Sequence, residues 1–237
     1  VGSLGSQSID NDAILRSKQL MVHGANEYVV TENGTEYFIE GYTSPPKLIL
    51  VGGGHVSKAI SSLADKLGFH VYVTDDRSEF ANKERFPEAK NTVAMQPEDA
   101  LKQIHITKNS FIVVATRGHR YDSVALAAAA KTSASYVGLL GSKRKIILIY
   151  EDLIKMGLPK DRIKELRAPI GLEINARTPD EIAISIISEM LMFRLGGSGQ
   201  NMKLDEKLIE NIFSKHANCL LYTSPSPRDA TLSRMPS

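Results

Sequence analysis

A glycine-rich turn directly after a short apolar run is the feature that most restricts how this chain can fold. The run Leu48–Val51 leads into Gly52–Gly54, and a helical pattern begins at His55. A strand that passes through glycines into a helix predicts a phosphate-binding turn, because glycines let an anion approach the backbone and the helix start offers free N–H groups. Ser57 stands where a small residue allows the helix to pack closely on the strand.

Short apolar runs alternate with longer helical patterns through most of the chain. The runs predict strands at residues 48–51, 71–74, 92–95, 111–115, 136–139 and 169–172. The helical patterns lie at residues 55–67, near Glu79, at 97–103, at 121–131, after Ser142 and from Pro179, which follows Thr178 and precedes Glu181 as in a capped helix start. This alternation predicts an α/β fold with a Rossmann-like, doubly wound parallel sheet.

A smaller region precedes this domain and ends in a predicted β-hairpin. A helical pattern occupies the first 25 residues, and two strand-like runs then flank Asn33 and Gly34, which favour a type I′ turn. Pro45 and Pro46 end the hairpin, because proline cannot donate to a strand ladder. We therefore expect a remnant of an N-terminal domain at 1–44, the Rossmann domain at 45–198, and a flexible segment with a short helix at 199–218.

The last segment, 219–237, has a different origin in our interpretation. Read back into codons, it resembles a sequencing adapter translated in frame, so we expect it to be foreign and disordered. It contains Cys219, the only cysteine of the chain, which excludes an internal disulfide and is compatible with a reducing, cytoplasmic location.

Charge and hydropathy argue against two classes of partner. A formal net charge of +2 gives no basic face for nucleic acid. No stretch reaches the roughly 18 to 20 apolar residues that a membrane-spanning helix needs. We therefore predict neither nucleic-acid binding nor a membrane span.

An acidic pair follows the second predicted strand of the Rossmann domain. Asp75 or Asp76 could accept hydrogen bonds from a ribose hydroxyl, as in dinucleotide-binding proteins. The adjacent Arg77 could instead tolerate a phosphate, so a preference between NAD and NADP stays open. The alternative is a solvated acidic pair beside a structural turn.

Polar residues also follow the fourth predicted strand, where ligands of such folds bind. His119 and Asp122 are candidates for a general acid and base, or for metal ligands together with His55. The structural alternative is a loop histidine bonded to the next helix, with Asp122 capping that helix.

A third turn, Gly141–Ser142, precedes the basic run Lys143–Lys145, which either binds an anion or forms a solvated helix start. We expect the three turns to line one crevice. The predicted cofactor-binding residues are Gly52, Gly53, Gly54, His55, Val56, Asp75, Asp76, Arg77, Thr116, Arg117, Gly141, Ser142, Lys143 and Arg144.

Taken in order, these motifs resemble the xanthine dehydrogenase accessory family (XdhC/CoxI). The resemblance covers about residues 45–199. It rests on the segments Gly52–Ser57, Phe80 with Arg85–Pro87, Thr116–Asp122, Tyr136–Ser142, Pro169–Leu172 and Thr178–Ala183.

The resemblance implies an accessory protein rather than a turnover enzyme. Such proteins hold the molybdenum cofactor (molybdopterin), assist its sulfuration and insert it into a molybdenum hydroxylase apoenzyme of the xanthine or CO dehydrogenase type. A cysteine desulfurase is a further candidate partner, and whether the chain forms a homodimer stays open. Val1–Gly5 resembles the end of the family's N-terminal domain, so we expect most of that domain, with its cysteine, to lie upstream.

Two other functions remain open from the residues themselves. The Gly52 turn and Asp75 also fit an NAD(P)-dependent oxidoreductase, such as a siroheme-type dehydrogenase, or a module that senses NAD(P). Only the oxidoreductase predicts nicotinamide turnover.

Overall fold

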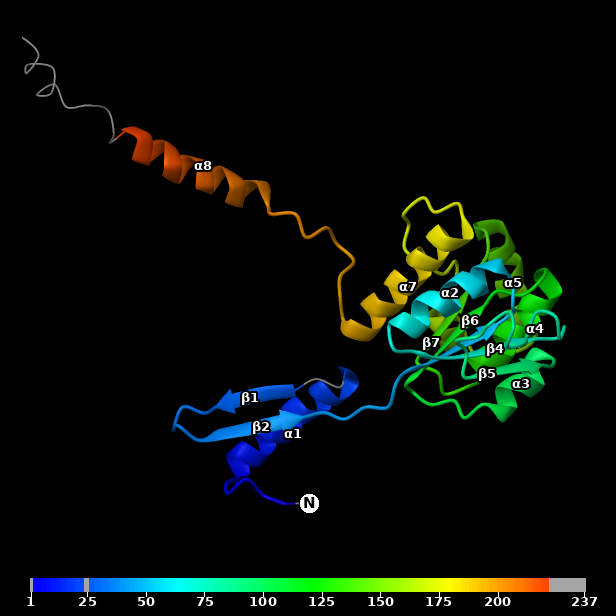
Figure 1. Ribbon diagram of the computed structural model, residues 1–237, viewed down its shortest axis with the longest axis horizontal. Coiled ribbons are helices and arrows are strands. Elements are labelled where there is room, and N and C mark those ends of the chain that lie inside the picture. Colours follow the sequence, from blue (N-terminus) through cyan, green and yellow to red (C-terminus); the bar gives the residue numbers. More distant parts are fainter. Residues whose placement is uncertain (1, 24–25, 222–237) are drawn as a thin grey trace, which may run out of the picture. The chain divides into compact units, whose positions relative to one another are not determined.

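The computed structural model describes residues 2–23 and 26–221 (Figure 1). The chain divides into two compact units, Val1–Gly199 and Gln200–Ser237, and residues 222–237 lie outside the described part. In the first unit, helix α1 (Gln7–His23) and the antiparallel strands β1 (Asn26–Val30) and β2 (Glu36–Glu40) precede the Rossmann domain.

A five-stranded parallel sheet forms the centre of the Rossmann domain, as predicted. Its strands are ordered β5-β4-β3-β6-β7. Their bounds are β3 (Lys47–Val51), β4 (His70–Asp75), β5 (Asn91–Ala94), β6 (Ser110–Val114) and β7 (Tyr136–Leu139). The strand order reverses between β3 and β6, so the crevice in which such folds bind ligands lies at the carboxyl ends of these two strands.

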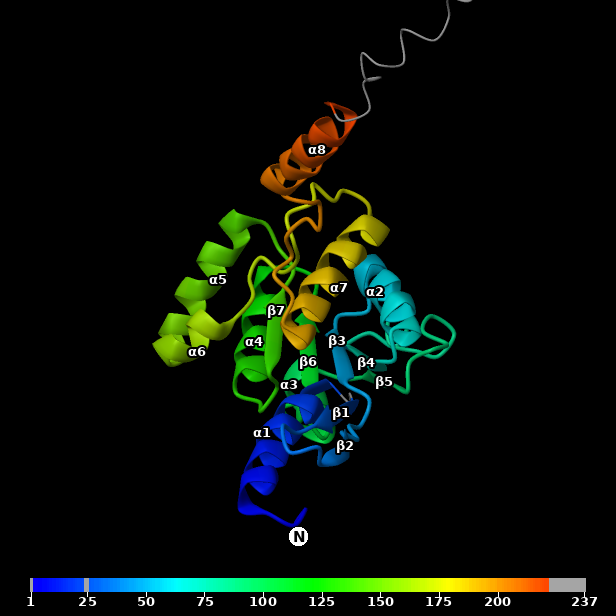
Figure 2. The same ribbon diagram turned by 90° about the vertical axis from the view of Figure 1, so that its left-hand side faces the viewer.

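Helices cover both faces of this sheet (Figure 2). Ile49 and Val51 of β3 point into a core with α3 (Pro97–Gln103), α4 (His119–Ala130), α5 (Lys143–Lys155) and α6 (Lys160–Glu165). Leu48 and Leu50 point to the other face, which is covered by α2 (His55–Lys66) and α7 (Pro179–Leu195). These four side chains of β3 are fully buried, as expected for a central parallel strand.

The helix predicted near Glu79 is wrong, because residues 76–90 form consecutive turns. Phe80 and Ala81 both donate from their backbone N–H groups to the Arg77 carbonyl, and the turns do not continue as a helix. Two packing demands explain this path: the side chain of Phe86 is fully buried, and the Phe80 carbonyl lies against the glycine turn.

The strand predicted at 169–172 is also wrong. The segment before it makes an isolated bridge between Gly138 and Arg167, and the Ile170 N–H then donates to the Leu139 carbonyl. Pro169 has no N–H group to donate, so the ladder is interrupted there, and the bond from Ile170 follows without forming a regular strand. Helix α6 was not predicted.

The hairpin is confirmed, but its turn is not of type I′. A type I′ turn needs positive φ at two consecutive residues. Here Gly34 has φ of +78° and Asn33 does not share this conformation. The Gly34 N–H donates to the Thr31 carbonyl, and the Thr31 hydroxyl also bonds with Thr35, which together favour a longer loop.

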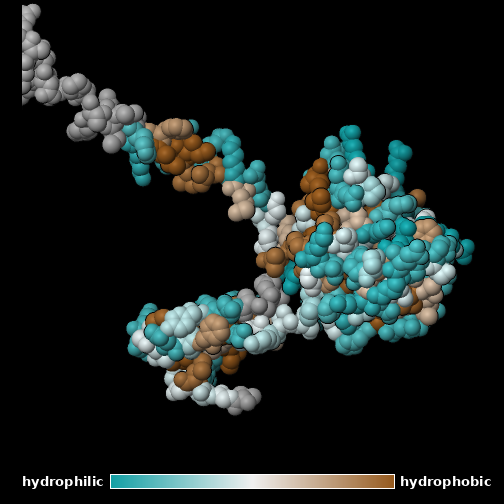
Figure 3. Space-filling model, viewed as in Figure 1, coloured by the Kyte–Doolittle hydropathy of each residue, from teal (hydrophilic) through white to brown (hydrophobic). Residues whose placement is uncertain are grey.

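The second unit contains helix α8 (Glu206–Leu221), on which hydrophobic side chains gather (Figure 3). Leu208, Ile212 and Phe213 are exposed. The segment predicted to be foreign lies outside the described residues except for 219–221, which continue this helix. Within the described ranges, no helix combines the length and apolar character that a bilayer crossing requires.

Candidate functional site

The glycine turn between β3 and α2 is held closely against two neighbouring segments. Gly52 has φ of +106°, and its N–H donates to the Thr74 carbonyl over 2.7 Å. A Cβ atom at Gly52 would lie 2.3 Å from the Ala115 carbonyl oxygen. Both the backbone conformation and the close approach therefore require glycine at this position.

Gly53 is the most closely packed glycine of the turn, which the sequence did not predict. A Cβ atom there would lie 1.9 Å from the Phe80 carbonyl oxygen. The Gly53 N–H donates to Asp75 Oδ2 over 2.9 Å. The turn is thus fixed from both sides by the end of β4 and by the segment that follows it.

Gly54 is open by comparison, and it marks the start of α2. A Cβ atom at Gly54 would meet nothing within 4 Å. No side chain caps the helix, and its first turn contains no acidic residue. The first backbone N–H groups of α2, including those of His55 and Val56, therefore have no intrahelical acceptor and form the positive end of the helix dipole, which favours an anion.

The carboxylate of Asp75 closes the base of this turn. Its Oδ1 accepts from Arg77 N at 3.1 Å and Nε at 2.9 Å, and its Oδ2 accepts from Gly53 N and from Arg77 Nη2 at 3.2 Å. Burial raises the pKa of this carboxyl, but the bonds from Arg77 and Gly53 outweigh burial and hold the pKa below its ordinary value. Asp75 is therefore ionised and fully engaged.

Two arginines flank Phe80 beneath the glycine turn. The Arg77 guanidinium carbon lies 3.6 Å from the Phe80 ring centroid, and the Arg85 carbon lies 5.1 Å from it. Arg85 Nε also donates to the Gly53 carbonyl over 2.8 Å. The sequence analysis included Arg85 among the family-like segments but assigned it no role, because only the folded chain brings it to Gly53.

An ion pair crosses the sheet edge from the end of β4 to the loop after β6. Arg117 Nη2 lies 2.8 Å from Asp76 Oδ2, and the Arg117 guanidinium lies over the Tyr121 ring at 5.1 Å. The cavity that this pair helps to line has a volume of only about 10 Å³, close to the minimum for one water molecule. It is lined by Gly52, Thr74, Asp75, Asp76, Pro97, Thr116, Arg117 and Tyr121.

Asp122 and His119 do not form the predicted acid–base pair. Asp122 is fully buried, and its Oδ1 accepts from Thr116 N at 3.1 Å and Thr116 Oγ1 at 2.6 Å. Its Oδ2 is paired with Lys145 of α5. His119 Nε2 instead lies 3.6 Å from Asp152 Oδ2. This arrangement is closer to the structural alternative, although Asp122 ties the loop to α4 rather than capping its N-terminus.

The metal set suggested by His55, His119 and Asp122 is not formed. Among the described residues, no group of three or more His, Cys, Asp or Glu side chains has an arrangement that could hold a metal ion. His55 lies on the exposed start of α2, whereas the other two residues have the partners given above.

The Gly141–Ser142 turn is connected to the loop after β6 through Lys145, which pairs with Asp122, and not through the small cavity. Ser142 caps α5 by accepting from Lys145 N at 3.4 Å, and Lys143 and Arg144 are exposed. Gly141 is half-buried and does not line the small cavity. The Gly52–Gly54 turn and the loop after β6 therefore share one crevice. The Gly141–Ser142 turn lies outside this crevice and contributes an exposed basic helix start.

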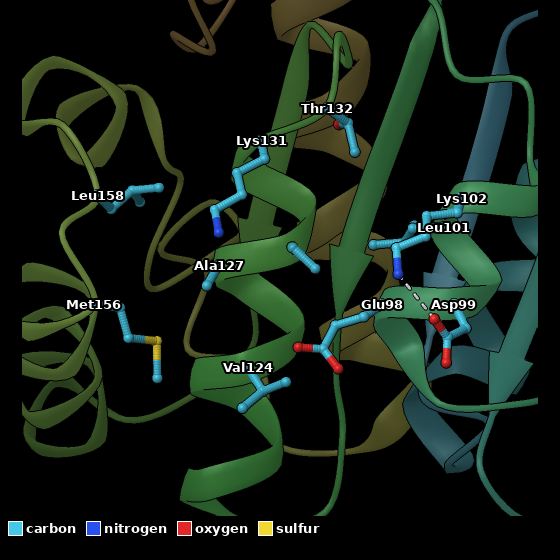
Figure 4. A pocket seen from close by; sticks show the side chains of 11 residues that line it. Glu98, Asp99, Leu101, Lys102, Val124, Ala127, Lys131, Thr132, Met156 and Leu158 are labelled. Atoms are coloured by element: carbon cyan, nitrogen blue, oxygen red, sulfur yellow. Dashed lines mark hydrogen bonds and ion pairs between the residues drawn. The ribbon is translucent and has the colours of Figure 1, made fainter.

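A larger cleft of about 680 Å³ lies elsewhere on the domain (Figure 4). Its walls come from α3, from the later part of α4 and from Met156 and Leu158 beyond α5. In Figure 4, the Lys102 ammonium group points to Asp99, with which it forms an ion pair. The cleft shares no residue with the glycine-turn site, so its size is no argument for that site.

Residues 48–190 match the XdhC Rossmann domain family. The chain belongs to the XdhC family. Among solved structures, it is similar to a xanthine dehydrogenase from Bacillus halodurans, with a TM-score of 0.56 and 22% identity over 81% of this chain and 66% of that one. This likeness supports the fold of the XdhC domain alone.

Curated relatives of this XdhC protein match over about two thirds of its length. YqeB of Escherichia coli K12, an uncharacterized protein, is 35% identical over 68% of this chain and 30% of its own length. A protein of Bacillus subtilis named as a probable xanthine dehydrogenase subunit is 30% identical, over 68% and 46%. PaoD of E. coli K12, a molybdenum cofactor insertion chaperone, is 23% identical, over 67% and 43%. The chain spans less than half the length of each.

Proposed function

We propose that this chain is part of an accessory protein that binds the molybdenum cofactor and delivers it to a molybdenum hydroxylase. Membership of the XdhC family and the name of its relative PaoD support this proposal. The observation that carries it is the open, uncapped N-terminus of α2 at Gly54. A phosphate group of the cofactor is the kind of ligand that such a helix start binds.

The residues present fit the phosphate end of this cofactor. The space next to Gly54 would admit the phosphate, and the N–H groups of His55 and Val56 would donate to it. Lys143 and Arg144 at the start of α5 supply further exposed positive charge in the same domain. Once inserted in its recipient enzyme, the cofactor supplies the redox-active metal. In this proposal, Gly52, Gly53 and Asp75 fix the shape of the site and do not contact the cofactor.

The finer steps belong to the same proposal. In the cytoplasm, the complete protein would hold the cofactor during sulfuration by a cysteine desulfurase, as a monomer or homodimer, and then pass it to the apoenzyme. His119 and Asp122 would act as structural residues, because each already has a charged partner. The chain would therefore have no turnover of its own.

The experiment mixes the full chain with molybdenum cofactor released from a molybdenum enzyme, removes unbound material on a desalting column, and measures bound molybdenum and pterin fluorescence. Metal and pterin that elute with the protein in equal amounts support the proposal. Elution of the protein without either would contradict it.

A parallel titration with NAD and NADP tests the alternatives. Tight binding with turnover would favour the oxidoreductase, and tight binding without turnover would favour a sensor. Because the Asp75 carboxylate is already occupied by Arg77 and Gly53, we expect neither result.

A further inference from the structure

We propose that the outward face of α5 binds a second copy of this chain, with the two α5 helices antiparallel about a twofold axis. The inference does not depend on the proposed function, and each can fail without the other. It starts from the exposed side chains of α5 (Lys143–Lys155). This helix packs against α4 and α6 and lies at one side of the domain (Figure 2).

The outward face of α5 carries three large apolar residues where a surface helix is normally polar. Ile147, Leu148 and Ile154 have 60%, 52% and 64% of their surface exposed. Helix α2 of the same domain shows the ordinary arrangement, because its exposed residues are all polar, namely His55, Lys58, Ser62, Asp65 and Lys66. Large apolar side chains that gather on one exposed helix face are typical of an interaction surface.

Two opposite charges lie along the middle of this face. With 3.6 residues per turn, Arg144 and Glu151 point directly away from the side chains that α5 buries in the core. Ile147 and Leu148 lie between them along the helix, one on each side of the line that joins the two charges. The face therefore has a basic end, an apolar centre and an acidic end.

These two charges are not neutralised within the part of the chain that the structure describes. The ion pairs of α5 involve Lys145, Asp152 and Lys155 instead. Arg144 also lies in the first turn of the helix, where the helix dipole disfavours a positive charge. The placement of Arg144 therefore does not serve the stability of α5, and its charge is available to a partner.

The face is complementary to itself when two copies of α5 run antiparallel. A twofold axis level with Ile147 and Leu148 lies equally far from Arg144 and Glu151 along the helix. Each arginine then faces the glutamate of the other copy, and the apolar residues of the two copies meet between these two ion pairs. A parallel arrangement would instead bring like charges together, so the charge pattern favours the antiparallel dimer.

The size of the contact predicts a weak dimer. Helix α5 has 13 residues. It is therefore about 20 Å long. A single pair of such helices buries less surface than a permanent dimer needs. We therefore expect a dissociation constant of about 10–100 µM.

Sedimentation velocity of the full chain, at concentrations from about 1 to 200 µM, tests for this dimer. We expect a reversible shift from monomer to dimer as the concentration rises. A monomer at every concentration would overturn the inference, and so would association that continues beyond the dimer, because a twofold contact closes on itself.

A charge exchange tests the antiparallel pairing. Arg144→Glu and Glu151→Arg should each weaken the dimer about tenfold or more, because each places like charges opposite one another twice. The double variant Arg144→Glu/Glu151→Arg should return the dissociation constant to within about threefold of the wild-type value. Failure of the double variant to recover would overturn the proposed pairing. Thermal unfolding of each variant shows that the fold is kept.

A pair of matched variants tests the apolar centre. Ile147→Glu should weaken the dimer about tenfold or more, because it buries a carboxylate in the contact. Ile184→Glu makes the same change on α7, at an isoleucine that is 50% exposed, and should leave the dimer unchanged. Equal losses in both variants, or association that persists in both, would place the contact on another surface and overturn the inference.

Discussion

Helices α2 and α7 pack on the same face of the sheet, yet their N-termini are built in opposite ways. Helix α7 begins with a complete capping box, in which Thr178 accepts from Glu181 N and the Glu181 side chain accepts from Thr178 N, and Pro179 is its first residue. Helix α2 begins at Gly54 with no cap and no acidic residue in its first turn. The capping box satisfies the N–H groups of Thr178 and Glu181 within the chain, and Pro179 has no N–H group, whereas no side chain caps the N–H groups of α2, which are available to a ligand.

This difference separates a helix start that serves stability from one that serves binding. A capping side chain typically stabilises a protein by about 0.5–2 kcal/mol, and α2 forgoes this contribution. The turn before α2 is held in place instead by Gly53, Asp75 and Phe80. Four substitutions test whether the two ends differ in this way.

Gly53→Ala should have the largest effect. Its Cβ atom would lie 1.9 Å from the Phe80 carbonyl oxygen, which belongs to the backbone and cannot turn away. We expect a loss of unfolding free energy of about 3 kcal/mol or more, measured by urea denaturation. Gly54→Ala is the matched control and should cost far less, because its Cβ atom points into open space. Similar losses in both variants would show that the turn is not fixed as described.

Asp75→Asn should cost about 2 kcal/mol at pH 7, because it leaves Arg77 without its charged acceptor. The pKa of Asp75 in the folded protein lies below the ordinary value of 3.8, so its stabilisation is present above pH 3.8 and is lost as the pH falls through the folded pKa. The stability difference between wild type and variant should therefore shrink below pH 3.8. Urea denaturation at pH 7 and at steps below pH 3.8 measures it, and a difference that is independent of pH would refute this role.

Gly54→Asp should convert the start of α2 into one that resembles α7. The new carboxylate can accept from the free N–H groups, so we expect stability to rise by a few tenths of a kcal/mol. Affinity for the molybdenum cofactor should fall about tenfold or more, since the anion site is then occupied and negatively charged. A variant that keeps full affinity would place the phosphate elsewhere.

Thr178→Ala should lower stability by about 1 kcal/mol and leave cofactor affinity unchanged, because it removes the cap of α7 only. Thr178→Ser keeps a hydroxyl at this position and should restore most of the loss. Thermal unfolding and pterin fluorescence together check both expectations, and a loss of affinity in Thr178→Ala would mean that the two helix starts are not independent.

The sequence predicted the sheet and most of its helices because β3, β6 and β7 are nearly continuous buried runs and because α7 has a start signal of its own. The capping pattern Thr178-x-x-Glu181 is local, so it could be identified without the fold. The predictions were wrong where contacts between residues far apart in the chain determine the path of the backbone. The turns at 76–90 depend on the space beneath Gly53, and the segment at 169–172 depends on its pairing with β7.

The site was predicted in outline for the same reason. Gly52 and Gly54 follow from a local pattern, but the saturation of Asp75 does not, because one of its partners is 22 residues away in the chain at Gly53. The pairing of Asp122 with Lys145 likewise joins two helices that the sequence could not place together. A sequence thus indicates which groups reach an edge of the sheet, whereas their partners decide which of them remain free.

Backbone amide NMR of the full chain, titrated with the phosphate monoester form of the molybdenum cofactor, tests the central claim most directly. If the start of α2 holds the phosphate, the largest shifts will occur at the amides of His55, Val56 and Ser57, while those of Asp180 and Glu181 at the start of α7 will stay in place. Shifts concentrated at α3 and α4, along the larger cleft, with no change at the start of α2 would contradict it.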